Sequence, residues 1–252
     1  MKKILILALA LFIALSAQAA EKGKTVKYKS GKDDVSGYLA MPEKKGTYPA
    51  VIMVHEWNGL NDWVKAQADD LASKGYVVLA VDLYRGKVGK TKEEAQALMQ
   101  GLSKDRAAED LKASYAYIET LDETKGQKVG SIGWCMGGGY ALATAQILSE
   151  KLSACVVCYG FVTTDKKELA PVKAKVLGIF GGKDTGIPVD KTVKPFEAAL
   201  KENGNKDVEI KVYPNSGHAF MNATNGMNTY NEADAKDAWA KTIAFFGKNL
   251  AK

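Results

Sequence analysis

The stretch that decides the fold is Val129-Gly130-Ser131-Ile132-Gly133-Trp134-Cys135-Met136-Gly137-Gly138-Gly139. Its first half is apolar and predicts a buried strand, and helical spacing begins at Met136. Between them, Gly133-x-Cys135-x-Gly137 has the glycine spacing of a nucleophile elbow, a sharp strand-to-helix turn, here with cysteine in place of serine. A tight turn with a packed cysteine, or a nucleotide loop, is the alternative, but the spacing fits neither Gly-x-Gly-x-x-Gly nor a P-loop.

A cysteine at this turn lies at a helix N-terminus, where positive potential favours thiolate over thiol. It also needs a proton acceptor, and the sequence has only two histidines, His55 and His218. His218 follows the last predicted strand and Asp184 follows the strand before it, which is the chain order expected of such a site. Asp190 is the main competitor for the acid, although its place early in the next helix also suits a residue that complements the helix dipole. The predicted triad is therefore Cys135, Asp184 and His218.

Acyl transfer needs backbone N–H donors for the developing oxyanion, one just after the nucleophile and one in the loop after an early strand. These positions are Met136 and Trp57. Glu56, next to Trp57, is predicted either to accept a hydrogen bond from the Cys135 thiol or to point into solvent. We expect His55 to be a structural hydrogen-bonding residue and not the base.

Strand-like and helical segments alternate along the rest of the chain. Strands are predicted at 35–41, 50–54, 77–81, 128–132, 154–159, 176–180 and 208–213, and helices at 62–74, 106–121, 136–148, 189–203 and 232–249. Apolar strands alternating with amphipathic helices predict an α/β fold, with a mostly parallel sheet covered on both faces and the early strands antiparallel at one edge. In such folds ligands bind at the carboxyl ends of the strands.

The N-terminus has the pattern of a secretory signal peptide, with a Met1-Lys2-Lys3 start, an apolar run at 4–15 and an Ala-x-Ala-type site ending at Ala19. The apolar run is shorter than the roughly 20 residues that span a bilayer. We predict a signal peptide at 1–19, a single domain at 20–252, and no membrane contact after cleavage. The Lys-Lys start and the lack of a lipobox-like cysteine near the cleavage point favour secretion across the inner membrane into a bacterial periplasm without a lipid anchor, with the cell exterior as the alternative.

Charge and cysteine content limit the possible partners. The formal net charge of +6 includes Lys2 and Lys3, and the remaining charges are spread along the chain, so no nucleic-acid partner is predicted.

Three cysteines are an odd number for an exported protein. Cys155 and Cys158 lie in one predicted strand with their side chains on opposite faces, so we expect them to pack in the core without bonding to each other. The oligomeric state is not predicted.

The sequence resembles the dienelactone hydrolase family of the α/β-hydrolases through His55-Glu56-Trp57-x-Gly59, Asp82-Leu83-Tyr84-Arg85, Gly133-Trp134-Cys135-Met136-Gly137-Gly138, Asp184 and Gly217-His218-Ala219-Phe220. The resemblance spans nearly the whole mature chain. It implies a Cys-Asp-His triad, a glutamate, here Glu56, that contacts the resting thiol, and Arg85 as an anchor for a substrate carboxylate. The family pattern has a second arginine where this sequence has Asn222, so Asn222 is a second candidate substrate-binding residue and the dienelactone itself is in doubt as substrate.

These observations predict a hydrolase that cleaves a small ester or lactone, with or without a carboxylate, through a cysteine nucleophile and a thioester. The predicted chemistry uses no metal and no cofactor. One rival is a non-catalytic protein of the same fold that binds a small ligand, since fold does not guarantee activity. The other rival is a thiol redox protein that uses Cys135.

Overall fold

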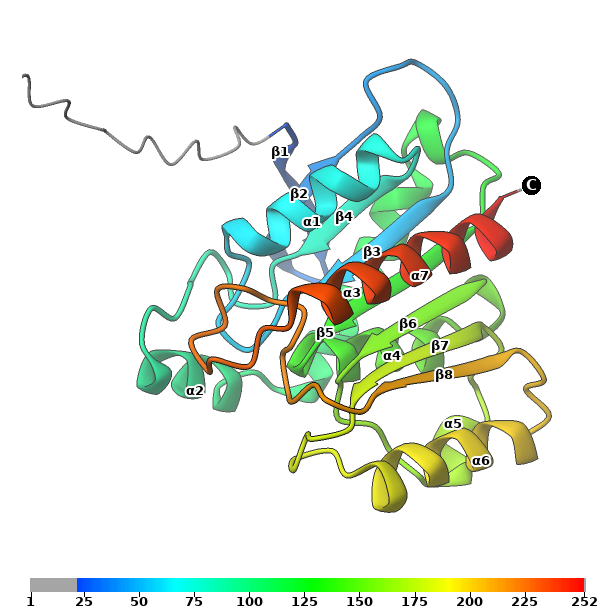
Figure 1. The fold of residues 1–252 in the computed structure, drawn as a ribbon. Coiled ribbons are helices and arrows are strands. Elements are labelled where there is room, and N and C mark those ends of the chain that lie inside the picture. The colour runs from blue at the N-terminus through cyan, green and yellow to red at the C-terminus, as the bar shows by residue number, and fades with distance from the viewer. Residues whose placement is uncertain (1–21, 252) are drawn as a thin grey trace, which may run out of the picture.

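The structure is a computed structural model and describes residues 22–251, so the predicted signal peptide lies outside the described residues. Figure 1 shows one twisted sheet with helices on both sides. The sheet has eight strands in the order β1-β2-β4-β3-β5-β6-β7-β8. Their bounds are Lys24–Ser30 for β1, Asp33–Ala40 for β2, Ala50–Val54 for β3, Val77–Val81 for β4, Val129–Trp134 for β5, Ala154–Cys158 for β6, Lys175–Gly181 for β7 and Val208–Tyr213 for β8.

Strand direction within the sheet agrees with the sequence prediction. Strands β1, β2 and β4 pair antiparallel, and every later pair is parallel. In the register of the parallel part, Val54 of β3 faces Gly133 of β5, and Trp134 of β5 faces Cys158 of β6. The carboxyl ends of these strands therefore meet at one edge of the sheet. The predicted α/β fold with a mostly parallel sheet is confirmed.

Helices cover both faces of the sheet, and the sheet separates two apolar clusters. The longer helices are α1 (Asp62–Ser73), α2 (Lys92–Gln100), α3 (Lys104–Glu119), α4 (Met136–Leu148), α6 (Lys194–Glu202) and α7 (Glu232–Leu250). Buried residues of α3, α4 and α6 belong to one apolar cluster, and those of α1 and α7 belong to the other. Cys155 packs in the first cluster and Cys158 in the second, both fully buried and both free thiols, as the strand period predicts.

Three elements differ from the sequence prediction. Strand β1 was not predicted, because its lysines alternate with partly buried residues at the sheet edge. Helix α2 was not predicted either, although Thr91 and Glu94 form a capping box at its start. The helix predicted at 189–203 consists of one turn of π-helix, Val189–Val193, followed by α6, whose first turn contains Pro195. Proline has no backbone N–H to continue the earlier turn, so the helix is reorganised there.

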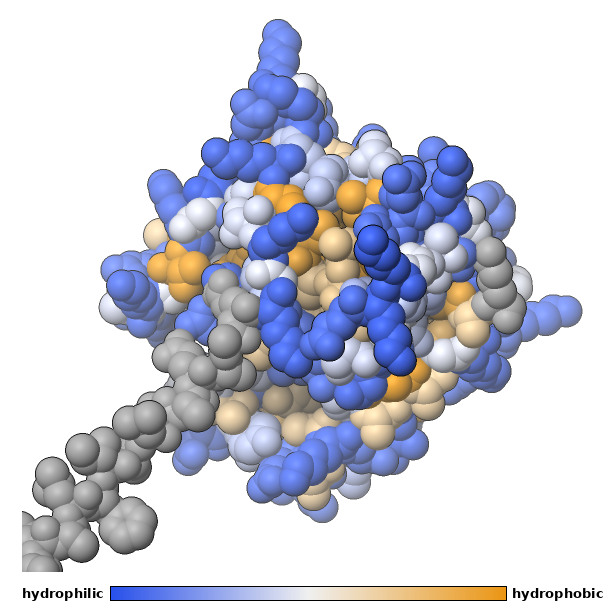
Figure 2. Space-filling model, turned by 90° about the horizontal axis from the view of Figure 1, so that it is seen from above, coloured by the Kyte–Doolittle hydropathy of each residue, from blue (hydrophilic) through white to orange (hydrophobic). Residues whose placement is uncertain are grey.

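Figure 2 shows one face of the molecule, on which hydrophilic side chains project outward around several apolar areas. Among residues 22–251, no helix is both long enough and apolar enough to cross a membrane.

Candidate active site

Strand β5 turns directly into α4 at Cys135, which has φ 53° and ψ −120°. Positive φ is costly for a residue with a side chain, and such strain collects at functional sites. The flanking glycines allow the turn to close. A Cβ at Gly133 would overlap the backbone of Gly137, and a Cβ at Gly137 would overlap the end of β3. The elbow geometry is therefore present, with half-buried Cys135 at its apex.

Cys135, His218 and Asp184 form one hydrogen-bonded chain. His218 Nε2 lies 3.0 Å from Cys135 Sγ, and His218 Nδ1 lies 2.7 Å from Asp184 Oδ2. The other carboxylate oxygen of Asp184 accepts backbone hydrogen bonds from Gly186 at 2.9 Å and Ile187 at 3.1 Å. The loop after β7 thus fixes the carboxylate, which in turn orients the imidazole toward the sulfur.

The electrostatics of this chain favour a charged histidine. Burial lowers the pKa of His218, but its hydrogen bonds to Asp184 and Cys135, together with the charges of both, outweigh burial and raise that pKa to about 10. An imidazolium beside a sulfur favours the thiolate. Asp190, the competing acid, is exposed and pairs with Lys194 at 2.6 Å. It is Asp184, and not Asp190, that contacts the histidine.

The two predicted oxyanion donors lie on elements that meet at the elbow. Met136 is the first residue of α4, where backbone N–H groups have no partner within the helix. Among the backbone hydrogen bonds of loops and caps within residues 22–251, none uses the N–H of Met136 or Trp57. The buried hydroxyl of Tyr84 contacts both residues, donating to the Trp57 carbonyl at 2.9 Å and lying 3.1 Å from Met136 Sδ. Tyr84 therefore ties the loop after β3 to the start of α4.

Glu56 contacts Asn222 and Tyr159. Asn222 Nδ2 donates to Glu56 Oε2 at 2.5 Å, and the Tyr159 hydroxyl donates to Oε1 at 3.4 Å. Glu56 is 3% exposed, so it does not point into solvent, and the Cys135 sulfur is hydrogen-bonded to His218. Asn222 is fully buried and its Oδ1 accepts from Thr224, so its amide is not presented to a substrate.

Burial dominates the protonation of Glu56. Burial raises the pKa of this carboxyl to about 7. The hydrogen bond from Asn222, the charge of His218 and the hydrogen bond from Tyr159 each act to lower that pKa, but burial outweighs them. Glu56 therefore gains its negative charge as the pH rises through neutrality, and that charge attracts the positive charge of His218.

His55 and Arg85 are both engaged away from the triad. His55 is fully buried, with Nδ1 2.6 Å from the Glu56 carbonyl and Nε2 3.3 Å from the Leu83 N–H. Arg85 donates to both oxygens of Asp110, at 2.6 and 3.0 Å, and the Asp110 side chain is 1% exposed. Arg85 has φ 57°, in a turn that directs its side chain toward α3. The guanidinium fork of Arg85 thus binds a buried carboxylate of the protein itself, and its role as an anchor for a substrate carboxylate stays a prediction.

Two tyrosines of this site were not singled out in the sequence. Tyr84 lies in the Asp82-Leu83-Tyr84-Arg85 motif, beside the predicted substrate anchor Arg85. Tyr159 was placed only at the end of a strand. It has φ 37°, donates to Glu56, and has its ring centroid 5.4 Å from that of His218. The available signal was position, since Tyr159 directly follows β6 at the sheet edge that carries the elbow.

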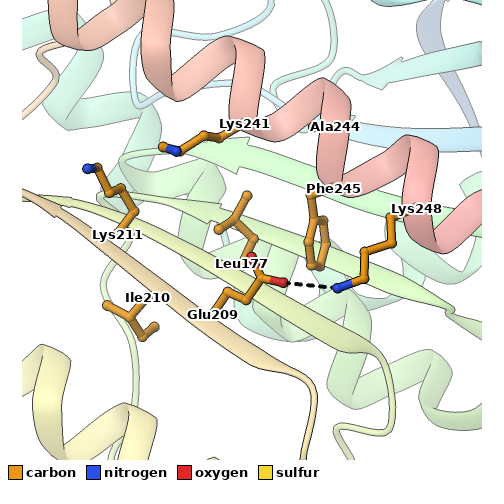
Figure 3. Close-up of a pocket in the computed structure, with 8 residues that line it drawn as sticks. All are labelled: Leu177, Glu209, Ile210, Lys211, Lys241, Ala244, Phe245 and Lys248. Carbon is orange, nitrogen blue, oxygen red and sulfur yellow. Dashed lines mark ion pairs between the residues drawn. The ribbon is translucent and has the colours of Figure 1, made fainter.

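A cavity of about 400 Å³ lies away from this site, between β8 and α7. Figure 3 shows Lys211 and Lys241 beside it and the ion pair of Glu209 with Lys248. Cys135, Asp184 and His218 do not line this cavity. It is open and of mixed charge, and it is separate from the chemistry described above.

The sheet order and the elbow define an α/β-hydrolase fold. The chain matches the dienelactone hydrolase family over residues 35–250 and belongs to that family, which makes it a hydrolase of the dienelactone hydrolase type. Protein usf of Aquifex pyrophilus is 32% identical to it over 234 residues, covering 90% of this chain and 99% of that protein. A protein of Aquifex aeolicus, named provisionally as a carboxymethylenebutenolidase, is 30% identical over 230 residues, covering 89% and 97%.

Solved structures agree with this assignment. A crystal structure of a provisionally assigned dienelactone hydrolase from Klebsiella pneumoniae is 26% identical, with a TM-score of 0.78 and coverage of 90% of this chain and 99% of that chain. A dienelactone hydrolase-like promiscuous phosphotriesterase from metagenomic libraries has a TM-score of 0.82 at 23% identity, covering 91% and 98%. The second similarity concerns the fold alone.

Proposed function

We propose that this protein hydrolyses a small ester or lactone with Cys135 as the nucleophile. One observation carries the proposal: the continuous chain from Cys135 Sγ to His218 at 3.0 Å and from His218 to Asp184 at 2.7 Å. A nucleophile, a base within hydrogen-bond reach and a group that orients the base are the parts that covalent catalysis requires.

The reaction starts from the thiolate of Cys135 and the imidazolium of His218. The thiolate attacks the carbonyl carbon, and the electron pair of the C=O bond moves to the oxygen, where the N–H groups of Met136 and Trp57 stabilise it. Collapse of this intermediate expels the alkoxide, which takes the proton of His218. A thioester on Cys135 and a neutral imidazole remain. With a lactone, the alcohol stays attached to the acyl group.

Water completes the cycle. It attacks the thioester carbonyl while His218 accepts its proton, with Asp184 holding the imidazole in place. Collapse of the second intermediate expels the Cys135 thiolate, which restores the ion pair and releases the carboxylic acid. In this scheme Glu56 acts on His218 through its charge and not by contact with the thiol.

The substrate class follows from what the site offers. The name of the Aquifex aeolicus relative suggests lactones as substrates worth testing. Arg85, the residue predicted to anchor a substrate carboxylate, is engaged with Asp110, and Asn222, the other predicted substrate-binding residue, is engaged with Glu56. We therefore propose that uncharged esters and lactones are preferred over carboxylated ones.

The test is turnover of matched p-nitrophenyl esters and lactones, with and without a carboxylate, by wild type and Cys135→Ala. Hydrolysis that depends on Cys135 and favours the neutral member of each pair supports the proposal. Hydrolysis retained by Cys135→Ala would overturn it.

We also propose that the protein is exported to a periplasm after cleavage near Ala19, on the basis of the leader pattern. Expression of the full chain in a Gram-negative host, followed by fractionation and N-terminal sequencing, tests this. A chain that starts near residue 20 in the periplasmic fraction supports export, and an intact N-terminus in the cytosol contradicts it.

A further inference from the structure

A groove of about 530 Å³, which we call the α4 groove, runs along the exposed side of α4. Met136, Tyr140, Ala143 and Ile147 line it at helical spacing, so one face of α4 forms its floor. Residues of α3 line one side of it, and residues of the segment after β6, beginning at Phe161, line another. From Met136 to Ile147 the floor is roughly 16 Å long, at a helical rise of 1.5 Å per residue.

The α4 groove begins beside the reaction centre. Met136 directly follows Cys135 and is one of the lining residues, and its N–H is the predicted oxyanion donor. At the same end, the ring of Phe161 lies with its centroid 6.2 Å from that of His218. Cys135, Asp184 and His218 do not line the groove themselves, but the end of the groove formed by Met136 and Phe161 lies next to Cys135 and His218.

The lining of the groove is mostly apolar. Two large apolar residues that line this groove are exposed, Phe161 at 61% and Met99 at 37%. Clustered apolar side chains are seldom exposed without a function, so their exposure here indicates a binding surface. The charged lining residues are of both signs, Lys104 against Asp105 and Glu168, and give no preference for a charged ligand. The groove therefore suits a neutral, elongated apolar chain.

We propose that the α4 groove is the acyl-binding subsite and that it selects substrates with an extended apolar acyl chain. This inference rests on the proposed function, because it takes Cys135 as the atom to which the acyl group becomes attached. It adds a substrate class, the longer-chain neutral esters, and assigns Phe161 and Ala143 as residues that determine chain-length specificity.

The test measures alkylation of Cys135, which does not require hydrolysis. 2-Chloroacetamide and N-octyl-2-chloroacetamide react with the thiolate by the same displacement of chloride, and intact mass with peptide mapping identifies the labelled cysteine. The ratio of the long-chain to the short-chain rate is normalised to the same ratio for a small free thiol. We expect a ratio of about tenfold or more for wild type, since each methylene that leaves water contributes up to about fourfold.

Two variants and a control locate the effect. Ala143→Trp fills the groove from its floor, and Phe161→Ala removes an exposed wall with little risk to folding. Each should reduce the normalised ratio toward one. Ala244→Trp is the control, because Ala244 lines the separate cavity in Figure 3. It should keep the wild-type ratio.

The outcomes separate this inference from the proposed function. A wild-type ratio near one, or a high ratio that survives both groove variants, overturns the acyl subsite whatever the esterase result. A high ratio abolished by both variants supports the subsite even if no ester in the panel is hydrolysed. Where hydrolysis is found, an octanoyl ester should be preferred over an acetyl ester in kcat/KM, and Ala143→Trp should reverse that order.

Discussion

The side-chain amide of Asn222 donates a 2.5 Å hydrogen bond to the buried carboxylate of Glu56, across 166 positions of the sequence. The contact engages Glu56 while the Cys135 sulfur is hydrogen-bonded to His218 at 3.0 Å. The site is therefore organised as a cysteine–histidine pair, with a carboxylate behind the histidine whose charge changes near neutral pH.

The free energy of unfolding should fall between about pH 4.5 and 7 because of Glu56. Burial raises the pKa of Glu56 from 4.5 to about 7 in the folded chain, so the folded state holds this proton more tightly than the unfolded state. The resulting stabilisation is complete below pH 4.5 and is lost as the pH rises through 7. Glu56→Gln should therefore gain stability relative to wild type across this window, by up to roughly 3 kcal/mol. Urea unfolding at a series of pH values measures it. Glu232→Gln, at an exposed carboxylate, is the control and should not show this gain.

Glu56 should also affect the reactivity of the thiol. Ionised Glu56 stabilises the imidazolium of His218, which in turn stabilises the thiolate. Glu56→Gln should therefore slow alkylation of Cys135 by 2-chloroacetamide several-fold at pH 8, with a smaller effect at pH 6. A carboxylate that instead kept the thiol protonated at rest would give the opposite result, faster alkylation in the variant.

Tyr84 should position the oxyanion donors. Its hydroxyl contacts the Trp57 carbonyl and the Met136 sulfur, so Tyr84→Phe releases both residues while keeping the ring. We expect kcat to fall by about tenfold with little change in KM, because poorly aligned donors affect the transition state most. The control is Tyr48→Phe, which removes a 2.8 Å hydrogen bond to the Lys44 carbonyl in an exposed loop. An equal loss of kcat in both variants would show that Tyr84 has no special role.

Arg85 should matter for stability more than for substrate choice. Removing one partner of a pair with a buried carboxylate is costly, and because Arg85 is itself 24% exposed we expect Arg85→Ala to lose about 2 kcal/mol of unfolding free energy. The ratio of kcat/KM for neutral and carboxylated esters should not change. A selective loss of activity toward the carboxylated ester would restore the role of anchor. Lys236→Ala, in an exposed ion pair with Glu232, is the stability control.

The sequence predicted those features that depend on local pattern and chain order. The elbow at Cys135 is a glycine spacing, and Asp184 and His218 follow successive strands, so topology alone brings them to one edge of the sheet. The parallel sheet followed from apolar strands that alternate with helices. These features do not require knowledge of where a side chain points.

Side-chain pairing was the part that the sequence did not predict. Glu56 was expected at the thiol, yet it meets Asn222, because the loop after His218 folds back over the end of β3. Arg85 was expected at the substrate, yet a positive φ turns it toward Asp110 on α3. Both outcomes depend on backbone direction in loops, which hydrophobic period and spacing do not specify.

The most direct measurement of the central claim is rapid-quench mass spectrometry of the protein mixed with a p-nitrophenyl ester. Wild type should gain the mass of the acyl group, and peptide mapping should place that group on Cys135. Cys135→Ala should show neither the adduct nor turnover. An acyl group on another residue, or turnover by Cys135→Ala, would contradict the account.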